Sequence, residues 1–250
     1  MSLFGHPFRL SLSSGPPAWS RRGALLWGTT ALIGLAATLS LGPAREAGAA
    51  ASLPKVVDVP SRPAFVRPPG RNEQRAQSGQ VLPGRSVLRT QNPGRMQVQL
   101  ANGRSFRLGG DAVLRLAAAG LDLERGQIIA WVNPGSKGGA PLRVKTRVGT
   151  ASIEGTTVFL EVTDDSIKVF SWEGQVRVTP EVPVAGAPRD VVLRSGEELT
   201  YSKGAWQAPR RLDAAEAGER RRKSILLNGF TAPMATLPVI ERELGLKPGP

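Results

Sequence analysis

Apolar and polar residues alternate through much of the chain, and the alternation is clearest between residues 144 and 178. β-Branched and aromatic side chains recur there at every second position, and the runs are broken at Gly149, at Asp164-Asp165 and at Glu173-Gly174. A period of two with such interruptions is typical of β-strands joined by tight turns. This stretch is therefore predicted to form consecutive antiparallel strands.

A two-residue turn at Asp164-Asp165 would fix which residues face each other across one predicted hairpin. The resulting cross-strand pairs are Val162 with Ile167, Leu160 with Val169, Glu161 with Lys168, and Phe159 with Phe170. Each pair contributes roughly 0.2–1 kcal/mol, so four matched pairs favour this register over a slip by one residue.

A second hairpin is predicted around Asn102-Gly103. A strict two-residue turn would place apolar residues opposite polar ones, whereas a three-residue loop over Ala101–Gly103 matches both faces. The longer loop sets Val98 against Phe106 and Met96 against Leu108, and it requires Gly103 in the left-handed conformation. We therefore expect the three-residue loop.

Further strands are expected at intervals of roughly 8–12 residues, a spacing typical of an all-β roll, sandwich or barrel. They lie near Ala112–Leu116, Gln127–Val132, Val191–Leu193 and Glu198–Tyr201, with Leu114, Leu116, Leu121 and Leu123 in the core. The predicted fold class is all-β, an antiparallel, roll-like domain over residues 85–205 with short helices after it.

The amino-terminal region has the order of a secretory leader. Arg21-Arg22 precede the uncharged stretch Gly23–Leu41, and small residues follow at 47–51. Residues 1–51 are predicted to be either a cleaved signal peptide or a retained single-pass anchor through 23–41, and the arginine pair leaves Sec and twin-arginine export open. Either form places the β domain in the periplasm or elsewhere outside the cytoplasm, with inner-membrane attachment in the second case.

Residues 52–84 are rich in proline, glycine, arginine and glutamine. Because proline cannot donate to a β-ladder and does not continue a helix, this stretch is predicted to be an extended linker.

The last part of the chain, residues 206–250, is predicted to be a basic helical tail. One helix is expected from Leu212 to a stop at Asn228-Gly229, with acidic residues early and basic residues late, and a second short helix near Pro238. The basic run Arg220, Arg221, Arg222 and Lys223 is either a solvated face or a candidate site for an anionic partner.

Composition excludes several kinds of chemistry. The chain has no cysteine, and its one histidine, His6, precedes the apolar stretch. The mature chain therefore has no disulfide, no zinc site built from histidine or cysteine, and no nucleophilic system that needs either residue. The carboxylates Asp164, Asp165 and Glu197 could serve an enzyme, but aspartate is favoured at turns for local backbone reasons. We expect no catalytic residue, metal or cofactor.

The net charge is +13, and without residues 1–51 it is about +10, from 29 basic and 19 acidic residues. Such a charge attracts polyanions. Aromatic residues are not interleaved with the basic run, so nucleic acid is not expected as the partner. The partner expected outside the cytoplasm is an envelope protein or an anionic cell-wall polymer.

The chain from about Val81 to Ser202 resembles the FecR domain family. The resemblance rests on several short motifs in a shared order: Ser86–Thr90, Leu100-x-Asn102-Gly103-x-x-Phe106-x-Leu108, Val144-x-Thr146-x-x-Gly149, Gly155-Thr156, Glu173-Gly174-x-Val176-x-Val178 and Leu193-x-x-Gly196-Glu197. Asn102 stands where the family usually has aspartate.

Two roles remain, and the second is the one that the resemblance implies. The first is a non-catalytic binding or scaffold protein of the cell envelope. The second is a FecR-type transmembrane signal transducer that regulates a sigma factor in response to an outer-membrane transporter. Only about 20 residues precede the apolar stretch, and they show no helical periodicity. We therefore expect the first role and keep the second as the alternative.

Overall fold

The computed structural model describes residues 53–100, 103–136, 140–182 and 189–246. The chain divides into two compact units, Met1–Ala47 and Gly48–Pro250, and every described residue belongs to the second. The predicted leader, including the apolar stretch 23–41, lies outside the described residues. Within the described part, no helix combines the length and apolar character needed to cross a membrane.

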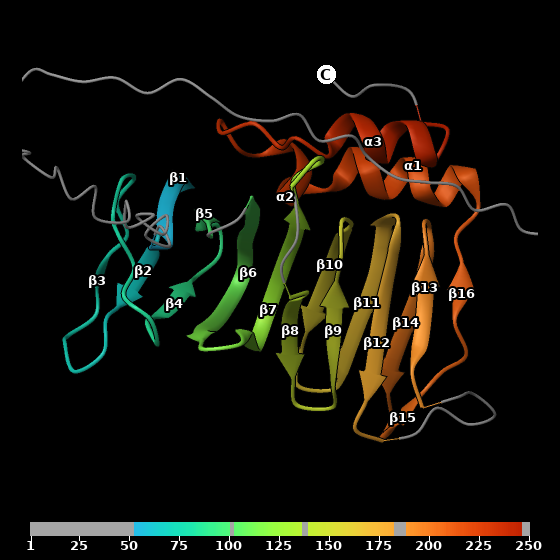
Figure 1. Ribbon diagram of the computed structural model, residues 1–250, viewed down its shortest axis with the longest axis horizontal. Helices are drawn as coiled ribbons and strands as arrows, with labels where there is room; N and C mark the ends of the chain where they lie inside the picture. The colour runs from blue at the N-terminus through green and yellow to red at the C-terminus, as the bar shows by residue number, and fades with distance from the viewer. Residues whose placement is uncertain (1–52, 101–102, 137–139, 183–188, 247–250) are drawn as a thin grey trace, which may run out of the picture. The chain divides into compact units, whose positions relative to one another are not determined.

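The described unit is mostly antiparallel β-sheet, with three short helices at its carboxyl end (Figure 1), which confirms the predicted fold class. The strands are β1 (Lys55–Ser61), β2 (Ala64–Arg67), β3 (Gln74–Arg75), β4 (Val87–Thr90), β5 (Arg95–Gln99), β6 (Arg104–Ala117), β7 (Gly120–Val132), β8 (Leu142–Thr146), β9 (Gly149–Ile153), β10 (Thr157–Val162), β11 (Ser166–Glu173), β12 (Gln175–Pro180), β13 (Val191–Arg194), β14 (Glu197–Ser202), β15 (Ala205–Trp206) and β16 (Arg210–Arg211). The helices are α1 (Ala214–Lys223), α2 (Ile225–Asn228) and α3 (Leu237–Glu243).

Two long strands, β6 and β7, connect two groups of strands. The first half of β6 pairs with β5 and its second half with β4. The second half of β7 pairs antiparallel with β10, whereas its first half forms the one parallel pair among the described strands, with β8. One layer therefore runs β1-β5-β6-β7-β10-β11-β14, and the other runs β2-β4-β6-β7-β8-β9-β12-β13.

A bend in the β6–β7 hairpin lets the same two strands enter both layers. The register shifts between Gly109 and Val113, where Gly110 and Asp111 have positive φ angles of 64° and 55°. Opposite them, Gly126 has φ 88°, and a Cβ built on it would lie 2.2 Å from the Ala112 Cα. Only glycine fits this position, because both the backbone conformation and the close approach exclude a side chain.

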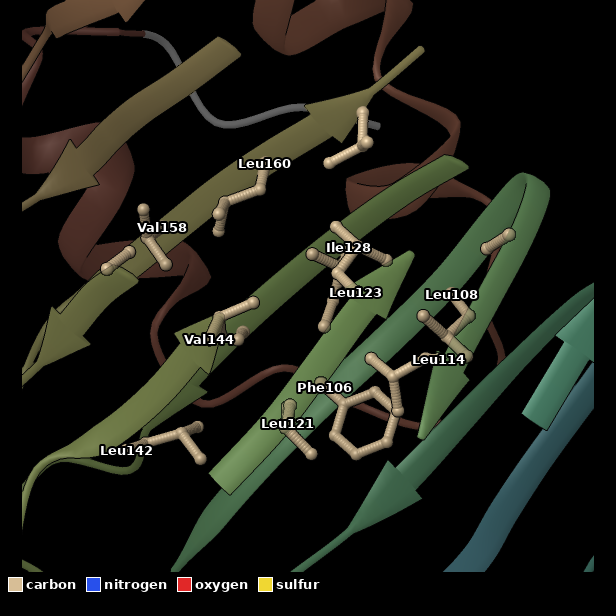
Figure 2. Packing of buried hydrophobic residues seen from close by; sticks show 14 of the residues in the cluster. Phe106, Leu108, Leu114, Leu121, Leu123, Ile128, Leu142, Val144, Val158 and Leu160 are labelled. Carbon is tan, nitrogen blue, oxygen red and sulfur yellow. The ribbon is translucent and has the colours of Figure 1, made fainter. Parts of the chain in front are cut away.

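The main core lies between the two layers. Leu114, Leu121 and Val144 come from one layer and Phe106 and Leu160 from the other, and all five are buried in a single hydrophobic cluster. Figure 2 shows the side chains of β6, β7, β8 and β10 directed into this common core. The four leucines predicted for the core, at 114, 116, 121 and 123, are all buried.

The carboxyl-terminal helices form a third layer at one end of the strands (Figure 1). They cover part of the outer face of the first layer, over β7 and β11. A second hydrophobic cluster forms there, from Ile129, Trp131, Phe170 and Trp172 on the strands and Leu212, Ala217, Leu226, Leu227, Met234 and Ile240 on the carboxyl-terminal segment. The Phe170 and Trp172 rings meet edge to face, 4.8 Å apart.

Both predicted hairpin registers are confirmed. The strands β10 and β11 pair Val162 with Ile167, Leu160 with Val169, Glu161 with Lys168 and Phe159 with Phe170. The strands β5 and β6 pair Val98 with Phe106 and Met96 with Leu108. Gly103 has φ 69°, as the three-residue loop requires, while Ala101 and Asn102 lie outside the described residues.

The prediction of an extended linker over 52–84 is wrong for the described part of that stretch. It contributes β1, β2 and β3, and Val56, Ala64, Val66, Ala76 and Leu82 are buried in the main core. Apolar residues between the prolines form β1 and β2, which pair with β5 and β4 respectively. Apart from the two-residue β3, β1 and β2 end the two layers, and the end of a sheet tolerates proline. The frequent prolines made the alternation of apolar and polar residues in this stretch hard to recognise from the sequence.

The expected helix from Leu212 to Asn228 is divided in two. Asp213 caps α1 through a capping box with Glu216, as the early acidic residues suggested. Ser224 then leaves the helical conformation, with ψ 102°, and its side chain caps α2 by accepting from the Leu227 N–H. A serine that can end one helix and begin the next interrupts a pattern that otherwise predicts a continuous helix.

Candidate functional site

Cationic side chains cover the outer face of the second layer. On these strands the apolar residues point into the core, so the intervening residues face solvent: Arg143 and Lys145 alternate with Leu142 and Val144 on β8, and Arg177 lies between two buried valines on β12. This alternation is a direct consequence of the two-residue period of a strand.

The registers bring outward residues of seven strands into one row. In spatial order from β2 to β12 the row contains Arg67, Val87, Arg115, Asp122, Lys145, Thr150 and Thr179. All seven are exposed or half-buried. Six strand intervals of about 4.8 Å make the row about 30 Å long, and it runs across the strands.

Two open depressions lie along this row and meet at Ala117. The first, of about 660 Å³, is lined by four arginines, namely Arg67, Arg71, Arg85 and Arg115, and by no carboxylate of the described residues. The second, of about 960 Å³, is lined by Arg143, Lys145, Arg177 and Arg189, by the carboxylates of Asp122 and Glu181, and by the hydroxyl groups of Thr150, Ser152 and Thr179. We call the two depressions together the basic groove.

Neighbouring carboxylates neutralise only part of the groove. Arg115 lies 3.3 Å from Glu124, and Arg177 lies 3.6 Å from Asp190. All four side chains are more than a third exposed, so these pairs are weak and leave the cations available to a ligand. Eight cations against two lining carboxylates give the groove a strongly positive field.

The basic run predicted as an anionic-partner site divides into two pairs. Arg221 is buried and donates to Glu241 Oε1 from Nε and Nη2. Arg220 lies 2.5 Å from Glu198 and 4.2 Å from the centre of the Phe170 ring. Both arginines thus hold α1 to the rest of the fold.

Arg222 and Lys223 project into solvent, and Lys223 forms an exposed pair with Glu219 at 2.6 Å. Of the four residues, these two are accessible to an anionic partner.

The carboxyl-terminal segment is fastened to the sheet by buried polar groups. The Arg107 guanidinium, in β6, donates to the carbonyl oxygens of Leu226, Leu227 and Ala232 at 2.7–3.1 Å. It also lies 4.4 Å from the centre of the Phe230 ring. Burial lowers the pKa of Arg107 to about 10, so the guanidinium remains charged at neutral pH.

Two acidic residues complete this attachment. Burial alone would raise the pKa of Asp58, but hydrogen bonds from Ala232 and Thr231 hold it below its usual value. Burial raises the pKa of Glu173, which accepts a 2.9 Å hydrogen bond from the Thr157 hydroxyl. The Thr157 hydroxyl in turn lies 2.8 Å from that of Thr236, in the carboxyl-terminal segment.

The carboxylates considered for catalysis do not converge. Asp164 and Asp165 are exposed at the β10–β11 turn, whereas Glu197, at the start of β14, accepts a hydrogen bond from the Arg194 N–H. Across residues 53–246, leaving aside the gaps in the description, no three or more His, Cys, Asp or Glu side chains gather as metal ligands would.

The basic groove was missed in the sequence, although a signal for it was present. Arg115, Arg143, Lys145 and Arg177 each occupy the polar position of an alternating strand. They are scattered over 63 positions and meet only through pairing between distant strands. The contiguous run at 220–223 drew attention because it is visible without knowledge of the registers.

Comparison with known proteins gives one family match. The family described as FecR protein matches residues 86–177, which include most of both layers. No curated protein matches the chain.

The solved structures that resemble the chain include two from Parabacteroides distasonis ATCC 8503, both with a provisional description as an anti-sigma factor. The first has a TM-score of 0.43 and 18% identity over 55% of this chain, and the second has 0.40 and 17% over 60%. The matches span 64% and 71% of those two chains. At these TM-scores and identities, the two structures do not indicate a function for this chain.

The family match covers the β6–β7 hairpin and the strands up to β12, on which most of the groove is built. These are also the strands that carry the Gly149 and Glu173-Gly174 motifs. Residues 86–177 therefore match the family described as FecR protein, and this part of the chain is similar to FecR domains.

Proposed function

We propose that this chain is a non-catalytic binding protein of the cell envelope whose FecR domain holds an anionic cell-wall polymer in the basic groove. The single observation that supports this role is the basic groove, whose row across seven strands contains Arg67, Arg115 and Lys145 and whose first depression is lined by four arginines and, among the described residues, no carboxylate. The positive field of the groove raises the rate at which a polyanion meets the chain, and the cations contact the polyanion once it is bound.

The location and the domain limits belong to the same proposal. Residues 1–51 direct the chain out of the cytoplasm, as a cleaved signal peptide or as a single-pass anchor, and the helices α1, α2 and α3 close the domain. The FecR family is associated with the envelope and is regulatory rather than enzymatic, which agrees with a binding role. The strands in 55–75 extend the domain beyond the expected start at residue 85.

Sedimentation with purified cell wall tests the proposed function. The chain should be retained by wall that carries its anionic polymers and released from wall stripped of them. Retention should weaken as added salt shortens the screening length from about 10 Å at 0.1 M to about 3 Å at 1 M. Equal retention on both walls would contradict the proposal.

A matched pair of variants locates the interaction. Replacing Arg67, Arg115 and Lys145 by glutamine removes three charges from the row and should abolish retention. Replacing Lys55, Arg125 and Arg211 by glutamine removes the same charge from exposed positions outside the groove and should leave retention nearly unchanged.

The exposed pair Arg222 and Lys223 is proposed as an auxiliary contact for the same partner. Replacing both by glutamine should weaken retention less than the groove variant does. Arg220 and Arg221 are expected to affect stability instead, because both are engaged with acidic residues of the fold.

The second candidate is a FecR-type signal transducer that controls a sigma factor in response to an outer-membrane transporter, and the FecR match favours it. Its test is capture from envelope extract. Recovery of a transporter protein by the chain, with no retention on cell wall, would support this role over polymer binding.

A further inference from the structure

The arrangement of charges along the row carries information about the ligand, provided that the groove is the binding site proposed above. Arg67, Arg115 and Lys145 lie on β2, β6 and β8, and each is separated from the next by one intervening strand. Two strand intervals correspond to about 10 Å, so the row presents a cation about every 10 Å over its first 20 Å. A chain with one charge about every 10 Å would match the cations of the row, and the other five cations of the groove lie outside the row.

The chemistry of the groove changes along its length. The end near β2 offers only arginines among its charged groups. The end near β12 combines cations with carboxylates and with the hydroxyls of Thr150, Ser152 and Thr179. Guanidinium groups bind carboxylates or phosphates, and mixed hydroxyl and carboxylate groups suit the hydroxyls of a sugar. One ligand that satisfies both halves carries anionic groups and many hydroxyls.

The direction of the groove requires an extended ligand. Its two depressions are open and adjoin at Ala117, and the row crosses seven strands over about 30 Å. A small anion would use only one part of it. From the spacing, the chemistry and the length together, we propose that the groove binds a linear anionic polysaccharide with about one charged group for every two sugar rings, laid across the strands.

Hyaluronan oligosaccharides of defined length are suitable probes, because they carry one carboxylate for every two sugars. Isothermal titration of the purified chain should show affinity that rises from the disaccharide to the hexasaccharide, about two- to fivefold for each added carboxylate, and then levels off. Neutral chitin oligosaccharides of equal length should bind far more weakly. Polyphosphate of equal length should bind no better than the hexasaccharide at 0.15 M salt, although its charge is denser.

Two substitutions in the same row should have opposite effects on hexasaccharide binding. Lys145→Gln removes the third cation and should weaken binding about two- to fivefold, while leaving tetrasaccharide binding at Arg67 and Arg115 unchanged. Asp122→Asn removes the carboxylate between Arg115 and Lys145 and should strengthen hexasaccharide binding by a similar factor. Both side chains lie on the outer face, and melting temperature checks that the fold is retained.

Equal affinity for the disaccharide and the hexasaccharide would overturn the inference, as would weaker binding by Asp122→Asn. The outcome is separable from the proposed function. If the unaltered chain is retained on cell wall but binds oligosaccharides without dependence on their length, only the inference is contradicted. If the unaltered chain is not retained on cell wall, the proposed function is contradicted.

Discussion

Single residues in the carboxyl-terminal attachment combine burial with charge. Glu173 is 4% exposed, and burial followed by the nearby charge of Glu243 raises its pKa above the ordinary value of 4.5. The folded protein therefore holds the proton of Glu173 more tightly than the unfolded chain does. This group stabilises the fold fully below about pH 4.5, and the contribution is lost as the pH rises through its folded pKa.

The variant Glu173→Gln tests this at the residue scale. The amide keeps an oxygen for the Thr157 hydroxyl and cannot ionise, so the variant should be more stable than the parent at pH 7 and close to it at pH 4. Urea unfolding at both pH values measures the difference. The exposed change Glu154→Gln serves as the control, and a pH-independent effect of Glu173→Gln would contradict the account.

At the scale of elements, the β10–β11 hairpin depends on which face each residue occupies. Leu160 is 1% exposed in the main core, whereas Glu161 points outward beside Lys168 at 3.6 Å. Leu160→Asp should cost several kcal/mol of unfolding free energy, because it buries an unpaired charge, and Glu161→Gln should cost under about 1 kcal/mol. Similar losses in chemical denaturation would refute the register.

The bend in the β6–β7 hairpin gives a second prediction at this scale. Gly126→Ala places a methyl group against the Ala112 backbone at a positive φ, so it should cost at least about 3 kcal/mol from strain and overpacking. Gly155→Ala is the matched control, since Gly155 also has positive φ but has no atom within 4 Å of the added Cβ. It should cost only about 1–2 kcal/mol. Thermal unfolding of the two variants compares them, and equal losses would show that the bend is not tightly packed.

The two hairpin registers were predictable because the paired residues lie close together in the sequence. Leu160 and Val169, for example, are nine positions apart, and a short turn links their strands. The layers depend on pairings such as Leu121 with Val144 and Val56 with Val98, which no short pattern specifies. The same reason hid the groove, whose cations belong to strands far apart in the sequence, and hid the burial of Arg221, which depends on where Glu241 lies in α3.

At the scale of the whole described unit, the carboxyl-terminal segment completes the fold by covering an aromatic face. Ending the chain after Arg211 would expose Trp131, Phe170 and Trp172 and leave Arg107 without its carbonyl partners. That variant should have a lower melting temperature and bind the dye ANS, because a contiguous apolar patch becomes exposed. Ending the chain after Leu246 should change neither property. Absence of dye binding by the shorter form would show that the helices do not shield the sheet.

The central claim is that an anionic polymer lies in the basic groove, and amide chemical-shift mapping of the chain tests it most directly. Titration with the hyaluronan hexasaccharide should perturb the amide signals of Arg115, Lys145 and Arg177, on the outer face of the second layer. The signals of the carboxyl-terminal helices should change much less. Perturbations confined to α1 around Arg222 and Lys223, with the groove signals unmoved, would contradict the claim.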